Sequence, residues 1–208
     1  MSFRLFVVRH GETAWTRERR YTGARDIPLN EAGRRQCEAV ALALASTQPA
    51  AVYASPLERA RASAEVIAKP HRLSVEPEPA FREMSFGDWE GLTRAEVAAR
   101  FPHEYETWRT SPERFQRPGA ETVPAVAERV AAGLAELRAT HEGESVILVT
   151  HAIVTRLLVL NALGLGPERL WTIDAATAGI SELEYRADWV TVHRMNTISH
   201  LAEREAEP

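Results

Sequence analysis

The chain has 208 residues, of which 45% are hydrophobic and 26% are charged, so its composition excludes the disordered class of proteins. Its formal net charge of −4 gives no general electrostatic reason to expect nucleic acid or a membrane surface as a partner. The single cysteine, Cys37, excludes an internal disulfide and a cysteine-based metal cluster. The length favours one domain over residues 1–208 with a sizeable core.

The two ends of the chain carry few signals. The first segment, MSFRLFVVRHG, reaches charged residues after an apolar run too short for a signal peptide, and no later run is long enough to span a bilayer. We therefore expect a soluble cytoplasmic protein. The last residues, LAEREAEP, predict a polar C-terminal tail from about residue 201.

Strand and helix patterns alternate from the start of the chain. An apolar strand is predicted at 5–8, and Asn30 is predicted to cap a helix with apolar residues at helical spacing. A short strand, AVYA, follows at 51–54. The next segment, SPLERARASAEVIA, predicts a helix with Ser55 as its N-cap and Glu58 completing a capping box.

The alternation continues in the second half. The patterns predict a strand at 73–77, a helix opened by Thr93 and Glu96, a long helix from Val123, a strand ending on His151, a helix closed by Gly164, and two strands within 179–195. This order predicts an α/β fold, a three-layer α/β/α sandwich with a mostly parallel central sheet and helices on both faces.

Two histidines directly follow apolar strands in this arrangement. His10 ends VVRH and His151 ends SVILVTH, while Arg9 precedes the first histidine and Arg59 lies in the first turn after the AVYA strand. Ligands of open α/β sheets bind outside the carboxyl ends of the strands, so these four side chains are predicted to converge. Guanidinium groups and free backbone N–H groups near helix starts are suited to a phosphate.

Such a pocket becomes catalytic if it also holds a nucleophile. A neutral imidazole attacks phosphorus directly, so His10 is the candidate, with its second ring nitrogen held by a hydrogen bond, for example to a backbone carbonyl. Arg9, Arg59 and a protonated His151 are then predicted to stabilise charge on the transferring phosphoryl group.

The leaving alkoxide needs a proton donor. Glu83, in FREMSFGDWEG, is the best candidate because it follows the predicted third strand, and burial beside Phe86 and Trp89 would raise its pKa. Asp88 and Glu90 are the local alternatives.

Five segments of the chain together resemble a known family, the histidine phosphatase (phosphoglycerate mutase-like) superfamily. They are RHGET at 9–13, YTGARDIPLNEAG at 21–33, SPLERA at 55–60, EMSFGDWEG at 83–91 and VTHA at 149–152. The resemblance extends from the first strand to about residue 200. It implies His10 as the phosphorylated nucleophile, Arg9, Arg59 and His151 as the rest of the phosphate pocket, Glu83 as proton donor, and no metal or organic cofactor.

Two positions depart from the family pattern. Thr16 stands where the family often has asparagine, and Ala152 stands where a glycine often follows the second histidine. A threonine hydroxyl can still donate to phosphate, and alanine is compatible with a helix start. Thr22 and Gly23 match a stretch that contacts phosphate or substrate in relatives. We therefore predict that all four residues, Thr16, Thr22, Gly23 and Ala152, bind phosphate or substrate.

A short lid insertion at about 93–122 separates phosphatases from mutases within this resemblance. The segment lacks the long basic, proline-rich stretch expected of glycolytic mutases, so a phosphatase similar to the broad-specificity and α-ribazole phosphatases is favoured. Four residues of this segment are candidates for selecting the alcohol: Phe101, Tyr105, Trp108 and Arg109. In contrast, Arg17, Arg19 and Arg20 are interpreted as surface charges, with the alternative that their loop lets one of them touch substrate.

Three alternatives remain open at this point. One is a cofactor-dependent phosphoglycerate mutase, and another is a noncatalytic phosphate-binding module, which would be expected to have lost His10 or Glu83. A third is a metal-dependent hydrolase with His10, His151 and Glu83 as ligands, although the adjacent arginines would repel a divalent cation. The expected partner is a phosphorylated small molecule, and an exposed edge strand or apolar helix face would allow a homodimer.

Overall fold

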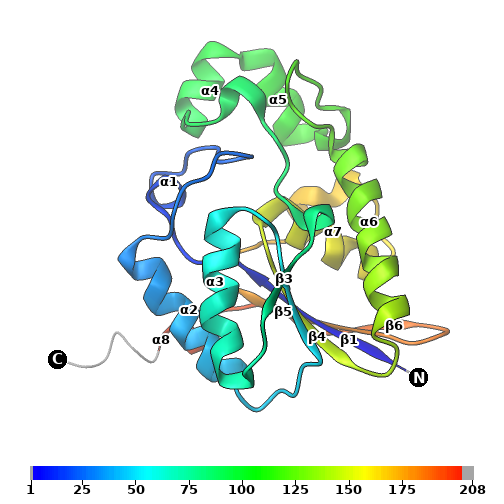
Figure 1. Cartoon of the computed structure of the whole chain (residues 1–208). Helices are drawn as coiled ribbons and strands as arrows, with labels where there is room; N and C mark the ends of the chain where they lie inside the picture. The colour runs from blue at the N-terminus through cyan, green and yellow to red at the C-terminus, as the bar shows by residue number, and fades with distance from the viewer. Residues whose placement is uncertain (1, 203–208) are drawn as a thin grey trace.

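Six segments rich in apolar residues form one sheet in the computed structural model, which describes residues 2–202 (Figure 1). The strands are β1 (Phe3–Arg9), β2 (Ala51–Ala54), β3 (Val75–Pro77), β4 (Ser145–Thr150), β5 (Ile180–Tyr185) and β6 (Val190–Thr197). Their order is β3-β2-β4-β1-β5-β6, and β5 alone runs in the direction opposite to the other five strands. The predicted, mostly parallel sheet is confirmed.

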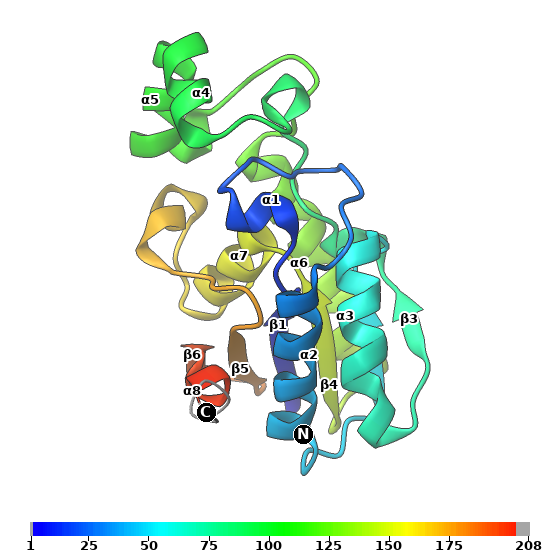
Figure 2. The ribbon, with the colours of Figure 1, turned by 90° about the vertical axis from the view of Figure 1, so that its left-hand side faces the viewer.

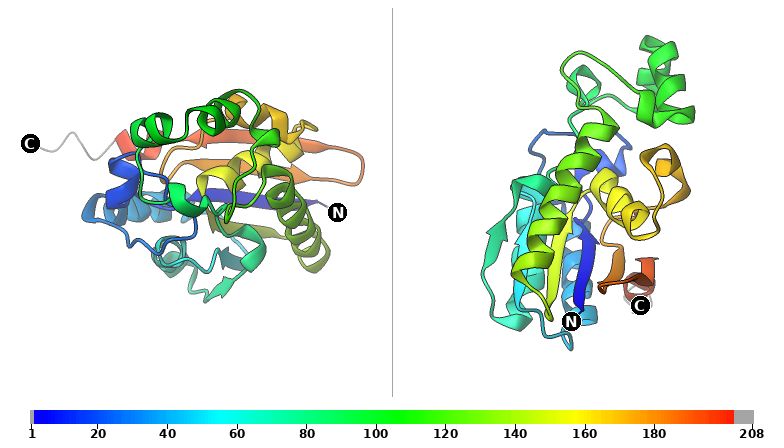
Figure 3. Two further views of the ribbon diagram at one scale, coloured as in Figure 1. Left: turned by 90° about the horizontal axis from the view of Figure 1, so that it is seen from above. Right: turned by 90° about the vertical axis from the view of Figure 1, so that its right-hand side faces the viewer.

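Helices cover both faces of this sheet (Figures 2 and 3). They are α1 (Ala14–Arg17), α2 (Glu31–Leu44), α3 (Glu58–Ala68), α4 (Arg94–Arg100), α5 (Pro102–Thr110), α6 (Val123–Thr140), α7 (Ala152–Ala162) and α8 (Ser199–Ala202). Five 3₁₀ turns join them: η1 (Lys69–His71), η2 (Pro79–Phe81), η3 (Gly87–Trp89), η4 (Pro112–Arg114) and η5 (Pro167–Thr172). The three-layer α/β/α prediction is confirmed.

The alternation of side chains along β1 divides the core into two layers. Leu5 and Val7 pack with residues of α6 and α7, whereas Phe6 and Val8 pack with residues of α2 and α3. All four side chains are buried, as expected for a strand covered on both faces. The sheet is therefore fixed between two helical layers, and only the ends of its strands are free to form a site.

The predicted start of α3 is wrong. The helix begins at Glu58 after Leu57, and no side chain caps it. Ser55, the predicted N-cap, lies with its Oγ 2.7 Å from His151 Nε2 and accepts a weaker bond from the Leu57 N–H. The Glu58 N–H donates instead to the Asp26 carboxylate at 2.7 Å. Contacts from distant parts of the chain thus replace the local capping box.

The other predicted helix signals hold. Asn30 Oδ1 accepts from the Gly33 N–H at the start of α2, and Thr93 and Glu96 form the predicted capping box of α4. Gly164 closes α7 with a φ of 67°, in the left-handed region that glycine adopts readily. Two predicted strands have shifted bounds, since β1 extends beyond 5–8 and β3 occupies only the end of 73–77.

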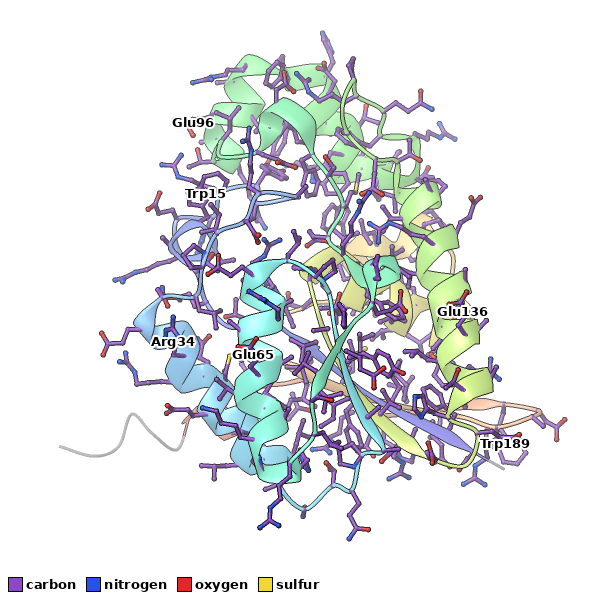
Figure 4. The ribbon with its side chains drawn as sticks, viewed as in Figure 1. Trp15, Arg34, Glu65, Glu96, Glu136 and Trp189 are labelled. Atoms are coloured by element: carbon purple, nitrogen blue, oxygen red, sulfur yellow. The ribbon has the colours of Figure 1, made fainter. Side chains whose placement is uncertain are left out.

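The helices α1, α4 and α5 lie at one end of the molecule. Helix α1 and the helices α4 and α5 of the predicted lid segment lie beyond one end of the sheet, where Trp15 and Glu96 are found, whereas Trp189 lies at the opposite end (Figure 4). Leu201, at the predicted start of the tail, belongs to α8 and packs against the core, and residues 203–208 of the predicted tail lie outside the described residues. Within residues 2–202, no helix is long and apolar enough to cross a membrane.

Candidate active site

A pocket of about 210 Å³ opens at the carboxyl ends of β1 and β4. Arg9 pairs with Thr150 in the sheet register, so the residues that follow, His10 and His151, leave the sheet at the same level. The imidazole rings of His10 and His151 lie 5.1 Å apart between centroids. Eight of the nine predicted site residues line the pocket: Arg9, His10, Thr16, Thr22, Gly23, Arg59, Glu83 and Ala152. The ninth, His151, is fully buried beside His10.

The hydrogen bonds of His10 define its tautomer. Nδ1 lies 2.7 Å from the Gly11 carbonyl oxygen, which can only accept, so Nδ1 carries the proton. Nε2 accepts a hydrogen bond from the Arg59 Nε–H at 3.2 Å, so this nitrogen is unprotonated and carries its lone pair. Burial, and then the positive charges of Arg59 and Arg9, place the pKa of His10 well below its usual range. The imidazole is thus neutral and nucleophilic at Nε2.

Arg59 and Arg9 are held by carbonyl groups. Arg59 is fully buried and donates to the Arg25 carbonyl at 2.7 Å and the Gly23 carbonyl at 2.8 Å. Arg9 donates to the Ala175 carbonyl at 2.6 Å, while its buried Nε has no partner among the described residues. Burial, followed by repulsion from Arg156, lowers the pKa of Arg9 to about 10. Carbonyls orient these guanidinium groups without neutralising them, so an anion is the natural counter-charge.

His151 is held by Ser55. Its Nε2 lies 2.7 Å from Ser55 Oγ, and its buried Nδ1 has no partner in the part of the chain that the structure describes. Burial, and then the charge of Arg59, place the pKa of His151 well below its usual range, which disagrees with the expected protonated form. A neutral His151 still donates if the Ser55 hydroxyl donates its hydrogen bond to an unprotonated Nε2, because the ring proton then sits on Nδ1.

Glu83 is a buried carboxyl that faces the same pocket. Its Oε1 accepts from the Met84 N–H at 3.0 Å, and its Oε2 accepts from the Ile153 N–H at 3.4 Å. Burial raises the pKa of Glu83 despite these bonds and the nearby arginines, as a proton donor requires. The position of Glu83 therefore fits the predicted role.

The two alternative carboxylates are used elsewhere. Asp88 pairs with Arg117, which donates to it through Nε at 2.5 Å and through Nη2 at 2.7 Å. Glu90 accepts from the Ala24 N–H and the Phe86 N–H, both at 3.0 Å. Neither carboxylate lines the pocket. Glu90 instead ties the 22–25 loop to the loop that carries Glu83.

Arg129 of α6 holds the Glu83 loop from the other side. Its Nη1 donates to the Ala80 carbonyl at 2.7 Å and the Arg82 carbonyl at 2.8 Å. The Arg129 Nε also bonds Glu121 at 3.0 Å, and Glu121 in turn accepts from the Ser85 N–H at 2.9 Å. No short motif marks this clamp, so the sequence did not indicate it.

Two of the predicted phosphate-binding residues, Thr16 and Gly23, have other partners in the structure. The Thr16 hydroxyl, predicted to donate to phosphate, donates to the Thr13 carbonyl at 3.0 Å and accepts from the Thr13 N–H at 2.8 Å, as part of the α1 cap. Gly23 has a φ of 53°, and a Cβ there would overlap the Glu90 carboxylate. Gly23 thus allows close packing and presents its carbonyl to Arg59.

Several lining residues were not anticipated. Arg94, Arg156, Tyr21 and Trp171 line the pocket. Arg19 and Arg20 also line it, Arg19 as an exposed and Arg20 as a half-buried side chain, which fits the alternative that their loop reaches the substrate. Arg156 follows Ala152 by four residues in α7, and this helical spacing is the one signal that could have indicated it.

Only one of the four lid candidates reaches the pocket. Trp108 lines it and accepts a hydrogen bond at its carbonyl from Trp171 Nε1 at 2.8 Å. Phe101 and Tyr105 pack against the core, while the exposed Arg109 pairs with Glu106. The lid's contribution to the pocket wall is therefore narrower than predicted.

The site does not offer the ligands of the metal-dependent alternative. Within residues 2–202, no group of three or more His, Cys, Asp or Glu side chains is arranged to hold a metal ion. The donor set around His10 is mainly guanidinium, which attracts anions and repels divalent cations.

Comparisons with known proteins agree with this geometry. A model of the histidine phosphatase superfamily (branch 1) matches residues 5–198. Phosphoserine phosphatase 1 of Hydrogenobacter thermophilus is 29% identical over 200 residues, which cover 96% of this chain and 95% of that protein.

Solved structures of similar proteins share the fold. YhfR of Bacillus stearothermophilus matches with a TM-score of 0.90 and 28% identity, over 96% of this chain and 99% of its own. The α-ribazole phosphatase of Shigella flexneri matches with a TM-score of 0.85 and 26% identity, over 93% and 96%. The predicted enzyme class, a hydrolase of phosphomonoesters of small metabolites, is confirmed. The chain belongs to branch 1 of the histidine phosphatase superfamily.

Proposed function

We propose that this phosphomonoesterase works through a covalent phosphohistidine formed at His10 Nε2. The observation that carries the proposal is the fixed tautomer of His10, with Nδ1–H on the Gly11 carbonyl and the Nε2 lone pair facing the Arg59 guanidinium. A nucleophile needs this unprotonated nitrogen, and phosphate oxygens bound to the same guanidinium would bring phosphorus next to it.

In the first step, His10 Nε2 attacks phosphorus and the phosphorus–oxygen bond to the alcohol breaks. Arg9 and Arg59 stabilise charge on the phosphoryl oxygens, and the unpartnered Nδ1 of His151 supplies a further donor. Glu83 gives its proton to the departing alkoxide. These roles use the buried groups as the structure orients them.

In the second step, the Glu83 carboxylate takes a proton from water as that water attacks the phosphohistidine. The phosphorus–nitrogen bond breaks, inorganic phosphate leaves, and His10 and Glu83 return to their starting protonation states. A mutase would instead return the phosphoryl group to a second alcohol, so the acceptor separates the two activities.

The experiment uses a chromogenic phosphate monoester with excess chelator and compares the parent protein with its His10→Ala variant. We expect phosphate release and an acid-labile phosphoenzyme in the parent but not in the variant. His103→Ala is the matched control, because His103 is exposed on α5 and lies outside the pocket. Turnover by His10→Ala would refute the assignment, and label passing to a phosphoglycerate rather than to water would indicate a mutase.

We further propose that the enzyme acts in the cytoplasm. Its single cysteine, Cys37, is buried and provides no intramolecular disulfide, in keeping with a reducing compartment. Fractionation of the native cells followed by immunodetection tests this location.

A further inference from the structure

The backbone that follows the candidate nucleophile contacts two helices at once. Gly11 and Glu12 leave the end of β1 and meet side chains of both α2 and α3. A Cβ on Gly11 would overlap the Gly33 carbonyl of α2, and a Cβ on Gly33 would overlap the Glu12 carbonyl. This close approach allows polar side chains of the two helices to reach backbone groups next to His10.

Gln36 of α2 fixes the peptide unit that joins Gly11 and Glu12. Its Oε1 accepts from the Glu12 N–H at 2.9 Å. The C=O and N–H of a trans peptide point in opposite directions, and no peptide bond among residues 2–202 is cis. The Gly11 carbonyl is therefore directed away from Gln36, and it accepts from His10 Nδ1–H at 2.7 Å. Gln36 thus acts on the His10 ring through one rigid peptide plane.

Ser63 of α3 fixes the preceding peptide unit, between His10 and Gly11. Its Oγ accepts from the Gly11 N–H at 3.1 Å and donates to the Arg59 carbonyl at 2.7 Å. The Ser63 side chain is fully buried, so no bulk solvent competes for these bonds. One hydroxyl therefore connects the backbone of the nucleophile with the residue whose guanidinium donates to His10 Nε2.

The orientation of the Gly11 carbonyl decides which ring nitrogen can attack. While it accepts from Nδ1–H, the proton of the neutral ring stays on Nδ1 and Nε2 keeps its lone pair. If the carbonyl turned away, the proton could move to Nε2 and block attack on phosphorus there. Gln36 and Ser63 do not line the pocket, so any influence on the reaction passes through His10 and not through the substrate.

We propose that Gln36 and Ser63 are positioning residues for the nucleophile. They hold the two peptide units that flank Gly11, and so keep its carbonyl on Nδ1 of His10. The kinetic consequence rests on the proposed function, because it assumes that Nε2 attacks phosphorus. The hold on the ring exists in the resting protein whether or not His10 is the nucleophile.

The kinetic test uses a chromogenic phosphate monoester. Gln36→Leu removes the acceptor and is expected to lower kcat by about 5- to 10-fold, while KM changes by less than about 2-fold. Gln36→Glu keeps an acceptor for the Glu12 N–H and should restore most of that kcat. Ser63→Ala should give a loss similar to that of Gln36→Leu. Gln48→Leu is the matched control, since Gln48 is exposed between α2 and β2 and lies outside the pocket.

Nitrogen NMR separates this role from a general loss of stability. In protein with 15N-labelled histidine, the signals of His10 are identified among the seven histidines by their absence from His10→Ala. The Nδ1–H proton is expected to move upfield and to exchange faster with water in Gln36→Leu and in Ser63→Ala. In Gln36→Glu, this signal should stay as in the parent.

An unchanged His10 signal in both Gln36→Leu and Ser63→Ala would overturn the inference, and so would equal losses of kcat in Gln36→Leu and Gln36→Glu. A changed signal with undiminished kcat would support the hold on the ring while refuting attack by Nε2. The failure of the inference and the failure of the proposed function are therefore distinguished in one set of variants.

Discussion

At the inner end of the pocket, Arg9 and Arg59 are held by backbone carbonyls. At the outer end, taken to include the lid segment beyond the pocket, Arg20 and Arg117 pair with carboxylates on exposed side chains, and Arg20 also donates to the Gly91 carbonyl. A carbonyl fixes the direction of a guanidinium but leaves its charge in full. A carboxylate neutralises the charge, and a pair of long exposed side chains holds its geometry loosely. The inner end therefore holds its positive charges at fixed positions, whereas the side chains of the outer end can change conformation to fit different substrates. Substitutions at the two ends should differ accordingly in effect.

The largest expected effect is at Arg59. Arg59→Lys keeps the charge but loses the planar fork that reaches the Gly23 and Arg25 carbonyls and His10 together. We expect kcat/KM to fall by about 100- to 1000-fold. Steady-state kinetics with a chromogenic monoester measures this, with Arg61→Lys on the exposed face of α3 as control. Near-normal activity in Arg59→Lys would show that the inner end needs only charge.

Glu83→Gln is expected to lower kcat by about 100-fold or more, and more for alkyl phosphates than for a nitrophenyl ester, whose leaving group needs no proton. Burial raises the pKa of Glu83 and lowers that of His10. Activity of the parent should thus fall as pH rises through the Glu83 pKa, and fall at acid pH only well below the usual histidine range. The loss of activity at high pH should therefore be absent from the pH profile of Glu83→Gln. Asp88→Asn is the control, and an unchanged profile in Glu83→Gln would contradict the assignment.

Ser55→Ala tests how His151 is held. Without the hydroxyl at 2.7 Å, the proton of neutral His151 is free to move to Nε2, and Nδ1 then no longer donates. We expect kcat to fall by about 10-fold, the worth of one hydrogen bond. Nitrogen NMR of the imidazole reports the tautomer directly. Ser145→Ala, at the far end of β4, is the control, and an unchanged tautomer would remove Ser55 from this role.

The smallest effect is expected at the outer end. Arg117 pairs with Asp88 and Glu104, and its guanidinium lies 3.8 Å from the centre of the Phe101 ring. Arg117→Gln should lower the free energy of unfolding by about 1 kcal/mol, while KM changes by less than about 3-fold. Denaturant unfolding and kinetics measure the two quantities. A loss of activity as large as that in Arg59→Lys would erase the distinction between the two ends.

The inner residues could be predicted because their positions follow from strand order. Arg9, His10 and His151 stand directly at strand ends, and the carboxyl ends of parallel neighbours meet at one edge of the sheet. Their place thus depends on the architecture alone, which the alternating pattern predicts.

The remaining parts depend on contacts between elements that no local pattern contains. Ser55 and Glu58 form a sound capping motif, yet His151 and Asp26 occupy the groups that the cap would have used. Arg94 lines the pocket together with residues of α7 that are distant in sequence, and its own sequence surroundings resemble those of any exposed helix start.

Glu90 has a consequence for motion. Its one carboxylate bonds the Ala24 N–H of one loop and the Phe86 N–H of the other, so the two loops travel together when the protein fluctuates. The carbonyls that hold Arg59 belong to the first loop, and the second loop carries Glu83. The Arg59 guanidinium, which contacts the nucleophile His10, and the proton donor Glu83 thus keep their separation when the loops fluctuate.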